Sequence, residues 1–551
     1  MKKLLLVFAA AWTCVGQAVA QKGNNHNFEI SKNLEVFNDI YKQLDRFYVD
    51  TLNADTVIGW AIDAMLNKVD PFTIHFSETN MDDLRTMTTG KYAGIGSIIR
   101  YKKSEDRVVI GEPYEGSPSD KAGVKAGDVI LSVDGTDVKG MPVEEVTKLL
   151  RGDAGTRFVL TVRRPGQEKE LSFKITRENI QLPAVPYYGM VADGVGYLLL
   201  NSFTEDCSRE VRRAIVSLKE QGARSLVLDL RGNPGGSLSE AVEVVNLFVP
   251  KGQKVVYTRG KLASSNMEYF TQKPPLDVDM PVVVLVDGGT ASAAEIVSGA
   301  LQDLDRAVVV GMRTYGKGLV QTLRETPYHG NLKVTTSRYY IPSGRCIQAY
   351  DYRHLKADGS VGTVPDSLTK VFHTAAGREV RDGGGIKPDV VMKPDSLADI
   401  VYEVAASDEL FDFATRYTVA HKEIAPAGEF GISDEEYDMF VKEMVAGNFP
   451  HKYRSGSVLE ILEKTARRDG CYDRAKEKID ELKALFTPDL EEDLRKNKKD
   501  IKKLLVDEII PRYYYQKGAV VQQLSGDVDL QEALKILSDP ETYARILGKR
   551  K

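Results

Sequence analysis

Three patterns of apolar and polar positions follow one another along the chain. In residues 27–70, apolar side chains recur about every four positions, which predicts amphipathic helices. Residues 90–180 contain short β-branched runs separated by Gly and Asp turns, with one helical stretch among them, which predicts a small β-rich domain. In residues 195–340, apolar strands alternate with helical stretches, and this alternation indicates a layered α/β domain.

The part of the chain after residue 430 carries signals for helix starts. Ser433 and Ser457 are each followed three positions later by Glu, which is the capping-box spacing. Asp539-Pro540 pairs an N-cap residue with a proline at the first helical position. Residues 351–395 are rich in Gly, Asp and Pro and predict a loop or linker. The whole pattern predicts an α/β multidomain protein with helical regions before and after the sheets.

The first residues have the three parts of an export signal. Two lysines precede an apolar stretch of about ten residues, and an Ala-Val-Ala cleavage site ends at Ala20. An apolar stretch this short does not span a bilayer core of about 30 Å as a helix. A buried N-terminal helix is the alternative interpretation. We expect residues 1–20 to be a signal peptide cleaved after Ala20, and the mature chain to be exported to the bacterial periplasm or cell envelope.

Composition and charge exclude several classes of protein. A hydrophobic content of 42% and a charged content of 28% are ordinary for globular domains and do not fit a disordered or multi-span membrane protein. Because 74 Lys and Arg are balanced by 79 Asp and Glu, the chain lacks the basic excess of proteins that wrap nucleic acid. Its 4 Cys form no CxxC pair, so neither a zinc site nor a disulfide scaffold is indicated.

The β-rich region contains a glycine-rich loop followed by a second glycine-bounded run. Residues 92–96 read Tyr-Ala-Gly-Ile-Gly and precede a strand, and residues 127–135 read Gly-Asp-Val-Ile-Leu-Ser-Val-Asp-Gly. A loop of this kind can turn its backbone N–H groups toward a carboxylate, while an exposed strand edge pairs with an extended peptide. A hairpin without a ligand is the alternative. The combined pattern resembles a PDZ domain, which implies that Gly94, Ile95 and Gly96 bind the C-terminus of a substrate.

Ser292 lies between a buried strand and a helix, and a purely structural explanation is available for it. Ser292 and Glu295 have capping-box spacing, and most serines at such positions only cap the helix. A nucleophilic serine also needs a base, and no Gly-x-Ser-x-Gly elbow occurs. No histidine lies between residues 76 and 328, so a histidine base would come from far along the chain.

Lys317 is a second candidate base, although its loop has another interpretation. Residues 311–317 follow an apolar strand and match the P-loop spacing G-x-x-x-x-G-K. Gly318, however, occupies the position of the Ser or Thr that would bind Mg²⁺, and an exported protein would rarely meet ATP. Gln321 follows Lys317 by four positions, so the two side chains share a face in either a helix or a strand.

Segment 282–321 resembles the core of the carboxyl-terminal processing (tail-specific) proteases, which are serine peptidases with a PDZ domain. The resemblance rests on residues 291–295, Ala-Ser-Ala-Ala-Glu, and on residues 314–321, Thr-Tyr-Gly-Lys-Gly-Leu-Val-Gln. Residues 229–236, Asp-Leu-Arg-Gly-Asn-Pro-Gly-Gly, resemble the oxyanion segment of that family. The resemblance covers about residues 30–395 and implies a crotonase-like α/β protease core with an inserted PDZ-like β domain.

The resemblance implies a Ser–Lys dyad. Ser292 would attack the peptide carbonyl, Lys317 would accept its proton, and Gln321 would hold the lysine amine by a hydrogen bond. A lysine acts as a base only when it is neutral, and burial lowers the ordinary lysine pKa of about 10.4. This mechanism requires no metal and no cofactor.

Two backbone N–H groups are expected to stabilise the tetrahedral oxyanion. Ala293 directly follows the nucleophile at a helix N-terminus and would supply one donor. Gly236 is the first choice for the second donor and Gly235 the next, because a glycine lets the backbone approach closely. A simple strand-to-helix turn is the alternative for this glycine pair.

The sequence therefore predicts an exported serine endopeptidase that selects proteins by their C-terminal tails. Its partners would be protein or peptide substrates with free apolar C-termini, a homo-oligomer is compatible with the sequence, and no nucleic acid is expected. The alternative from another class is a non-catalytic PDZ scaffold or chaperone of the cell envelope, which predicts loss of Ser292 or Lys317. The expected domains are a signal peptide (1–20), an N-terminal helical region (21–89), a PDZ domain (90–180), a serine protease core (181–395) and a C-terminal helical region without an assigned role (396–551).

Overall fold

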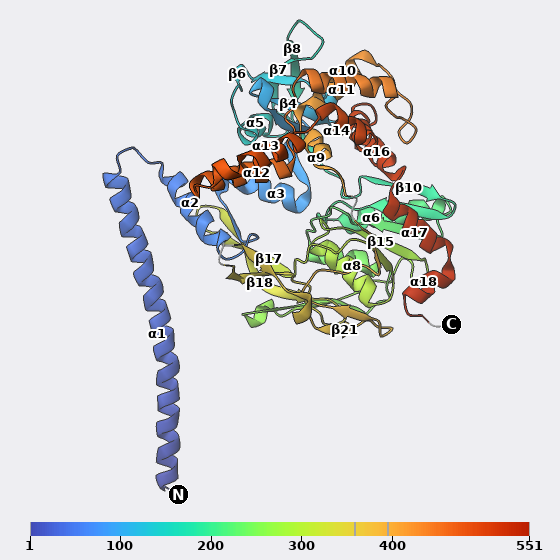
Figure 1. Cartoon of the computed structure of the whole chain (residues 1–551). Helices are drawn as coiled ribbons and strands as arrows, with labels where there is room; N and C mark the ends of the chain where they lie inside the picture. Colours follow the sequence, from blue (N-terminus) through green and yellow to red (C-terminus); the bar gives the residue numbers. More distant parts are fainter. Residues whose placement is uncertain (1, 357–359, 394–395, 550–551) are drawn as a thin grey trace. The chain divides into compact units, whose positions relative to one another are not determined.

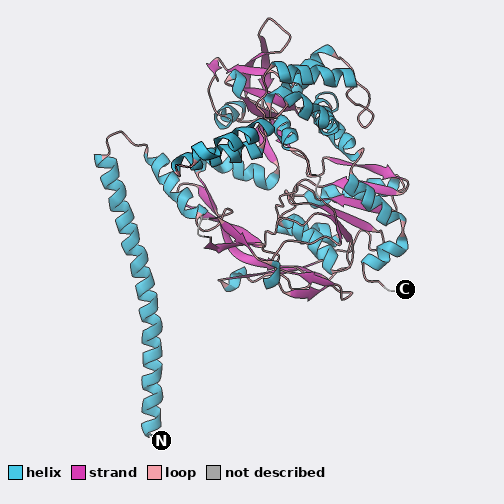
Figure 2. Cartoon of the chain, viewed as in Figure 1, coloured by secondary structure: helices cyan, strands magenta, loops and turns pink. Residues whose placement is uncertain are grey.

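The computed structural model describes residues 2–356, 360–393 and 396–549 (Figure 1). The chain divides into two compact units, Met1–His75 with Leu323–Val334, and Phe76–Thr322 with Thr335–Lys551. Helices and strands alternate through the middle of the chain, and from Asp399 to residue 549 the described elements are all helices (Figure 2).

The first unit contains α1 (Lys2–Phe47) and α2 (Ala54–Asn67), as the apolar spacing predicts. Asn53 caps α2, because its Oδ1 accepts a hydrogen bond from Thr56 N at 2.9 Å. The predicted signal peptide forms the beginning of α1, and its cleavage remains a prediction. Within the described residues, no helix combines the length and the apolar character needed to cross a membrane. The chain continues through β1 (Ile74–Phe76) and α3 (Met81–Thr89).

The β-rich region is an antiparallel sheet with the strand order β3-β4-β5-β7-β8, in which β6 pairs with β5. Strands β2 and β9 pair separately. The PDZ-like core contains Ile95, Val124 and Val146, all buried. The elements are β2 (Lys91–Gly94), β3 (Ser97–Lys102), β4 (Arg107–Pro113), α4 (Pro118–Ala122), β5 (Val129–Val133), β6 (Thr136–Asp137), α5 (Val143–Leu150), β7 (Arg157–Arg163), β8 (Leu171–Thr176) and β9 (Glu178–Gln181).

The central domain is a 6-stranded sheet with the order β10-β11-β12-β15-β16-β23. Strand β10 is antiparallel and the remaining neighbours are parallel, which is the layered α/β arrangement that the sequence predicts. Every residue of β15 is buried, because helices cover both faces of the sheet. The strands are β10 (Tyr187–Ala192), β11 (Val195–Leu199), β12 (Ser225–Asp229), β15 (Val282–Val286), β16 (Val308–Gly311) and β23 (Val390–Val391).

The two faces of this sheet are covered by helices from distant parts of the sequence. Helices α6 (Cys207–Glu220), α7 (Leu238–Asn246) and α8 (Ala293–Asp303) bury one face. Helices α17 (Val528–Ser538) and α18 (Pro540–Ile546) bury the other, where Leu530 and Ile536 pack against Val283 and Val308. Figure 1 shows α17 beside the strands of this sheet. The last two helices therefore complete the core of the central domain.

A second, smaller sheet contains β13 (Lys254–Gly260), β14 (Glu268–Phe270), β17 (Leu319–Thr326) and β18 (Gly330–Tyr340). The structure of residues 351–395 differs from the loop or linker that the sequence predicts. Where these residues are described, they form short paired strands. Glycines at positive φ, such as Gly377 and Gly383, allow tight turns between strands too short to show an apolar period. The pairs are β19 (Tyr350–Leu355) with β20 (Val361–Thr363), and β21 (Val371–His373) with β22 (Glu379–Arg381).

The C-terminal region is helical, as predicted. Ser433 and Glu436 form the expected capping box, and Pro540 begins α18 behind the N-cap residue Asp539. The prediction for Ser457 is wrong, because the helix begins earlier, at Arg454, and encloses Ser457. The helices are α9 (Asp399–Ala405), α10 (Asp408–Ala420), α11 (Asp434–Ala446), α12 (Arg454–Arg468), α13 (Tyr472–Leu485), α14 (Leu490–Lys496), α15 (Lys498–Ile509) and α16 (Pro511–Leu524), followed by α17 and α18.

Candidate active site

Ser292 lies at the N-terminus of α8, immediately after the loop that leaves β15. Its φ of 55° and ψ of −115° are rare for a residue with a side chain. Backbone strain of this kind costs of order 1–3 kcal/mol and concentrates at functional sites. The side chain is partly exposed, whereas the following Ala293 is buried. The turn therefore presents Ser292 at the end of an otherwise buried strand and helix.

The Glu295 carboxylate joins the Ser292 segment to the Lys317 segment. The side chain is 0% exposed and accepts hydrogen bonds from the backbone N–H groups of Ser292 at 2.8 Å, Gly316 at 2.7 Å and Lys317 at 2.9 Å. The hydroxyl of Thr314 donates to it as well, at 2.5 Å. Sequence spacing identified Glu295 only as a helix-cap partner. The structure adds that one buried carboxylate fixes both segments.

Burial raises the pKa of Glu295 to about 7, although its four hydrogen bonds favour the charged form and act in the opposite direction. The ordinary value is 4.5. As the pH falls through about 7, the carboxyl takes up a proton and loses acceptor capacity. Because this folded-state pKa lies above the ordinary value, the protonated carboxyl is favoured in the folded protein, and Glu295 contributes more to stability as the pH falls from about 7 toward 4.5.

Lys317 lies two residues before the start of β17, and Gln321 lies within β17. Both side chains are partly buried. Gln321 Nε2 donates to Thr335 Oγ1 on β18 at 3.0 Å. The P-loop interpretation is wrong, because a strand follows Lys317 where a P-loop has a helix. In addition, the N–H groups of Gly316 and Lys317 already donate to Glu295, whereas a P-loop turns such groups toward phosphate.

Gly235 packs directly against Ser292 and Ala293. A Cβ atom at Gly235 would lie 2.7 Å from Ser292 Cβ and 2.8 Å from Ala293 N, and its φ is +98°. At Gly236, whose φ is +141°, a Cβ atom would lie 2.4 Å from Phe203 O. Only glycine fits at these two positions. The glycine pair therefore brings backbone close to both Ser292 and the N–H of Ala293.

The N–H groups of the two glycines differ in their partners. Gly235 N donates to Asn233 Oδ1 at 2.9 Å, so this donor is already occupied. Phe203 forms backbone bonds with Gly235 O and Ser237 N, which flank Gly236 in a parallel bridge. In such a bridge, the N–H of the middle residue points away from its partner. The N–H of Gly236 therefore points away from Phe203, whereas the N–H of Gly235 is bonded to Asn233 Oδ1.

Several hydrogen bonds tie the predicted oxyanion segment, residues 229–236, to the loop before Ser292. Ala291 N donates to Asn233 O at 2.9 Å, and Thr290 Oγ1 donates to Leu230 O at 2.9 Å. Gly232 N donates to the carboxylate of Asp287 at 2.9 Å. Two loops that follow neighbouring parallel strands are therefore fixed to each other at the same edge of the sheet.

The predicted carboxylate loop of the PDZ domain joins β2 to β3. Gly94 ends β2, Ile95 is 4% exposed, and Gly96 has a φ of +72°. Ser119 N donates to Ile95 O at 3.0 Å, and Ser119 Oγ donates to Gly96 O at 3.1 Å. A Cβ atom at Gly96 would lie 2.5 Å from Ser117 Cβ. The loop carbonyls are thus directed toward α4, and Gly96 is required for the close approach.

Comparison with protein families matches three separate parts of the chain. Residues 109–164 match the PDZ domain, residues 194–368 match peptidase family S41, and residues 400–537 match the "Probable PDZ-protease, C-terminal helical domain". The helical region to which the sequence analysis assigned no role is therefore a domain known from PDZ proteases.

Two curated relatives show the same affiliation. A carboxy-terminal-processing protease of Bartonella bacilliformis is 36% identical over 344 residues, which cover 62% of this chain and 77% of the relative. A probable CtpA-like serine protease of Staphylococcus aureus is 33% identical over 403 residues, which cover 72% of this chain and 78% of the relative.

A solved structure of the photosystem II D1 C-terminal processing protease is 28% identical and covers 66% of this chain and 93% of that chain, with a TM-score of 0.35. The curated relatives and the matched domains support a serine-type peptidase. The chain belongs to the carboxyl-terminal processing proteases of peptidase family S41, with a PDZ domain and a C-terminal helical domain.

Proposed function

We propose that this protein is an exported endopeptidase that captures substrates by their C-terminal tails and cleaves them with a Ser292–Lys317 dyad. The observation that carries the proposal is the Glu295 carboxylate, which binds backbone N–H groups on both the Ser292 and the Lys317 segments. A serine that only capped α8 would not need a second loop anchored to the same carboxylate. The presence of both dyad residues favours this function over a non-catalytic scaffold or chaperone.

The proposed reaction starts when Ser292 Oγ attacks the peptide carbonyl carbon while its proton passes to the neutral Lys317 amine. Gln321 orients that amine without adding a charge. The oxyanion accepts hydrogen bonds from the N–H groups of Ala293 and Gly236, and loss of one such donor costs about 3 kcal/mol. Lys317 then gives its proton to the leaving amine, and water, deprotonated by the same lysine, releases the acyl group. All steps use residues of this chain.

In this proposal, residues 1–20 direct export and are removed after Ala20, and the mature protein acts in the bacterial periplasm or cell envelope. The proposed domains are a helical region (21–89), the PDZ domain (90–180), the protease core (181–395) and the C-terminal helical domain (396–551). A direct test is mass analysis of a purified protein substrate after incubation with residues 21–551. Internal cleavage of a tailed substrate is expected, and an intact substrate would favour the scaffold instead.

We expect amidation of a substrate's C-terminus to slow its cleavage. The loop at Gly94, Ile95 and Gly96 is proposed to donate N–H groups to the terminal carboxylate, and hydrogen bonds to a charged group contribute about 1.5–3 kcal/mol each. Removal of the charge should therefore lower kcat/KM about tenfold to a hundredfold. The measurement compares free-acid and amidated forms of one protein with an apolar last residue. Equal rates would contradict tail capture, and a short peptide that reaches Ser292 directly serves as the control.

We expect Glu295→Gln to lower kcat at least about tenfold and to destabilise the fold. The amide places an NH₂ group against N–H groups from which the carboxylate now accepts hydrogen bonds. Each buried N–H left without an acceptor costs about 1–3 kcal/mol. Activity assays and thermal melting measure the two effects. Glu436→Gln is the matched control, because Glu436 accepts from Ser433 N at 2.7 Å in the capping box of α11. A Glu295→Gln enzyme as active as the Glu436→Gln enzyme would contradict the joining role of Glu295.

A further inference from the structure

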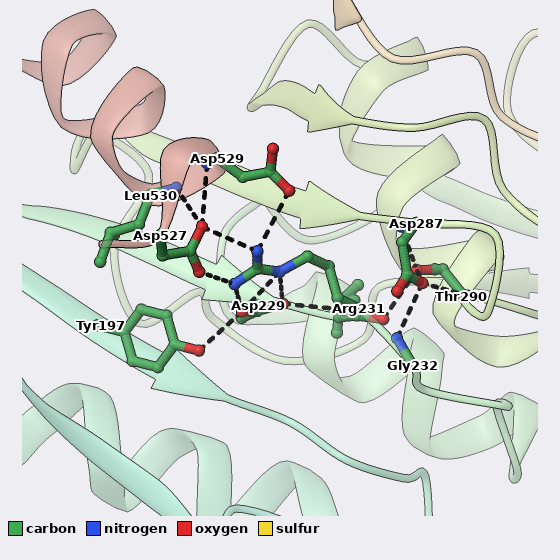
Figure 3. A network of polar contacts seen from close by, with 10 residues as sticks. Tyr197, Asp229, Arg231, Gly232, Asp287, Thr290, Asp527, Asp529 and Leu530 are labelled. Carbon is green, nitrogen blue, oxygen red and sulfur yellow. Dashed lines mark hydrogen bonds and ion pairs between the residues drawn. The ribbon is translucent and has the colours of Figure 1, made fainter. Parts of the chain in front are cut away.

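The guanidinium group of Arg231 lies among three carboxylates at the end of β12 (Figure 3). Arg231 Nη2 binds Asp229 Oδ2 at 2.6 Å and Asp527 Oδ2 at 2.5 Å, and Nη1 binds Asp529 Oδ2 at 3.2 Å. The Arg231 side chain is 23% exposed and that of Asp527 is 11% exposed, so water screens these contacts only in part. An ion-pair network therefore connects the oxyanion segment to the start of α17, almost 300 residues later in the sequence.

Asp527 has two functions in this network. Its Oδ1 caps α17 by accepting from Asp529 N and Leu530 N, both at 3.0 Å. Its Oδ2 accepts a hydrogen bond from Arg231 Nη2, and the capping Oδ1 also accepts one from Arg231 Nη1 at 3.1 Å. Burial alone would raise the pKa of Asp527, but Arg231 together with the backbone N–H groups of Leu530 and Asp529 outweighs burial and lowers the pKa below its ordinary value. The same carboxylate thus fixes the N-terminus of α17 and binds the core.

Within the protease core, Asp229 fixes the position of Arg231. Asp229 Oδ1 accepts from the backbone N of Arg231 at 2.9 Å, and Tyr197 Oη donates to Asp229 Oδ2 at 2.7 Å. The segment that begins at Arg231 reaches Gly235, whose backbone packs against Ser292. Displacement of Arg231 would therefore shift the first residues of the segment that carries the proposed oxyanion donor.

The helix that precedes α17 also contacts the PDZ domain. Tyr515 Oη in α16 donates to Asp120 Oδ1 in α4 at 2.9 Å. Asp120 follows Ser119, which donates to the carbonyls of the carboxylate loop. The C-terminal helical domain thus contacts α4, which lies beside the proposed tail-binding loop. Further along the chain, the same domain contacts the oxyanion segment.

We propose that Arg231 is a positioning residue for catalysis, and that the C-terminal helical domain sets the oxyanion geometry through Asp527 and Asp529. The inference rests on the proposed function, because it presumes that Gly236 N–H stabilises the oxyanion. Donors that are held in place before the reaction lower the barrier most, since they need no reorganisation when charge develops. The helical domain therefore contributes to the rate of the chemical step, in addition to covering the sheet.

The sharpest variant is Asp527→Asn in the full-length mature protein. Asparagine caps a helix about as well as aspartate, so its Oδ1 preserves the start of α17. Its Nδ2 group, however, places a donor against the Arg231 guanidinium, where the carboxylate oxygen was. Asp539→Asn is the matched control, because Asp539 Oδ1 caps α18 in the same way, by accepting from Glu541 N at 3.0 Å and Thr542 N at 3.1 Å.

We expect Asp527→Asn to lower kcat about tenfold or more while KM stays within about twofold of wild type. The loss should be equal for a short fluorogenic peptide and for a tailed protein, whereas a PDZ defect would affect only the tailed protein. Arg231→Gln should lower kcat similarly, and the double variant should be no worse than Arg231→Gln alone, because both changes break one network. Asp539→Asn should retain the wild-type kcat.

Amide hydrogen exchange of residues 232–237 gives a second readout that does not depend on activity. We expect exchange in this segment to be at least about tenfold faster in Asp527→Asn than in wild type or in Asp539→Asn. Unchanged exchange in this segment, or a kcat equal to wild type, overturns the positioning role. If the wild-type protein itself cleaves nothing, the proposed function fails, and the exchange comparison alone decides whether the helical domain holds the oxyanion segment.

Discussion

Replacement of Lys317 by arginine is expected to abolish peptide cleavage as completely as replacement by alanine. Arginine keeps the positive charge but does not deprotonate in proteins, so it cannot accept the serine proton. Loss of a general base lowers kcat by about 10²–10⁴-fold. Both variants keep the backbone N–H that donates to Glu295, so the Lys317 loop should remain anchored. Single-turnover cleavage of a peptide substrate measures the effect.

Two further properties separate a lysine base from a structural lysine. Wild-type activity should rise with pH as the amine loses its proton. A metal chelator should have no effect on the rate. Turnover by Lys317→Arg at a rate comparable to wild type would show that Lys317 has a structural role and is not the base.

Ser292→Ala is expected to lower cleavage by about 10³-fold or more while the protein remains folded. Glu295 accepts from the backbone N of Ser292, so this contact survives removal of the hydroxyl. Loss of a serine cap costs only about 1 kcal/mol. Ser433→Ala removes a serine cap at α11, where Ser433 Oγ accepts from Glu436 N at 3.1 Å, and it should leave activity unchanged. Cleavage by folded Ser292→Ala at the wild-type rate would remove Ser292 from the mechanism.

Much of the fold could be predicted because its elements carry local signals. The buried run Val282–Val286 appears as a continuous apolar stretch, and helix Val143–Leu150 is the one helical stretch expected within residues 90–180. Short strands within residues 351–395 were missed, because all but one of these paired strands have only three residues and show no apolar period. Ser457 was misassigned, because its spacing to Glu460 also occurs inside a helix.

The candidate site was predictable at the level of motifs but not of geometry. The positive φ of Ser292 and the second set of bonds to Glu295 depend on a loop that follows another strand. Arg231 and Asp527 are far apart in the sequence, and neither carries a local signal for the other. The role of the last helices was missed for the same reason, because the apolar face of α17 fits the core sheet only once both have folded.

The central claim is that Ser292 forms a covalent acyl-enzyme with the help of Lys317. The most direct measurement is the intact mass of the enzyme, quenched after mixing with an activated peptide ester, followed by mapping of the modified residue. The account predicts one acyl group on Ser292 in wild type, no adduct in Ser292→Ala, and a strongly slowed adduct in Lys317→Arg. An acyl group on another residue, or acylation of Lys317→Arg at the wild-type rate, would contradict it.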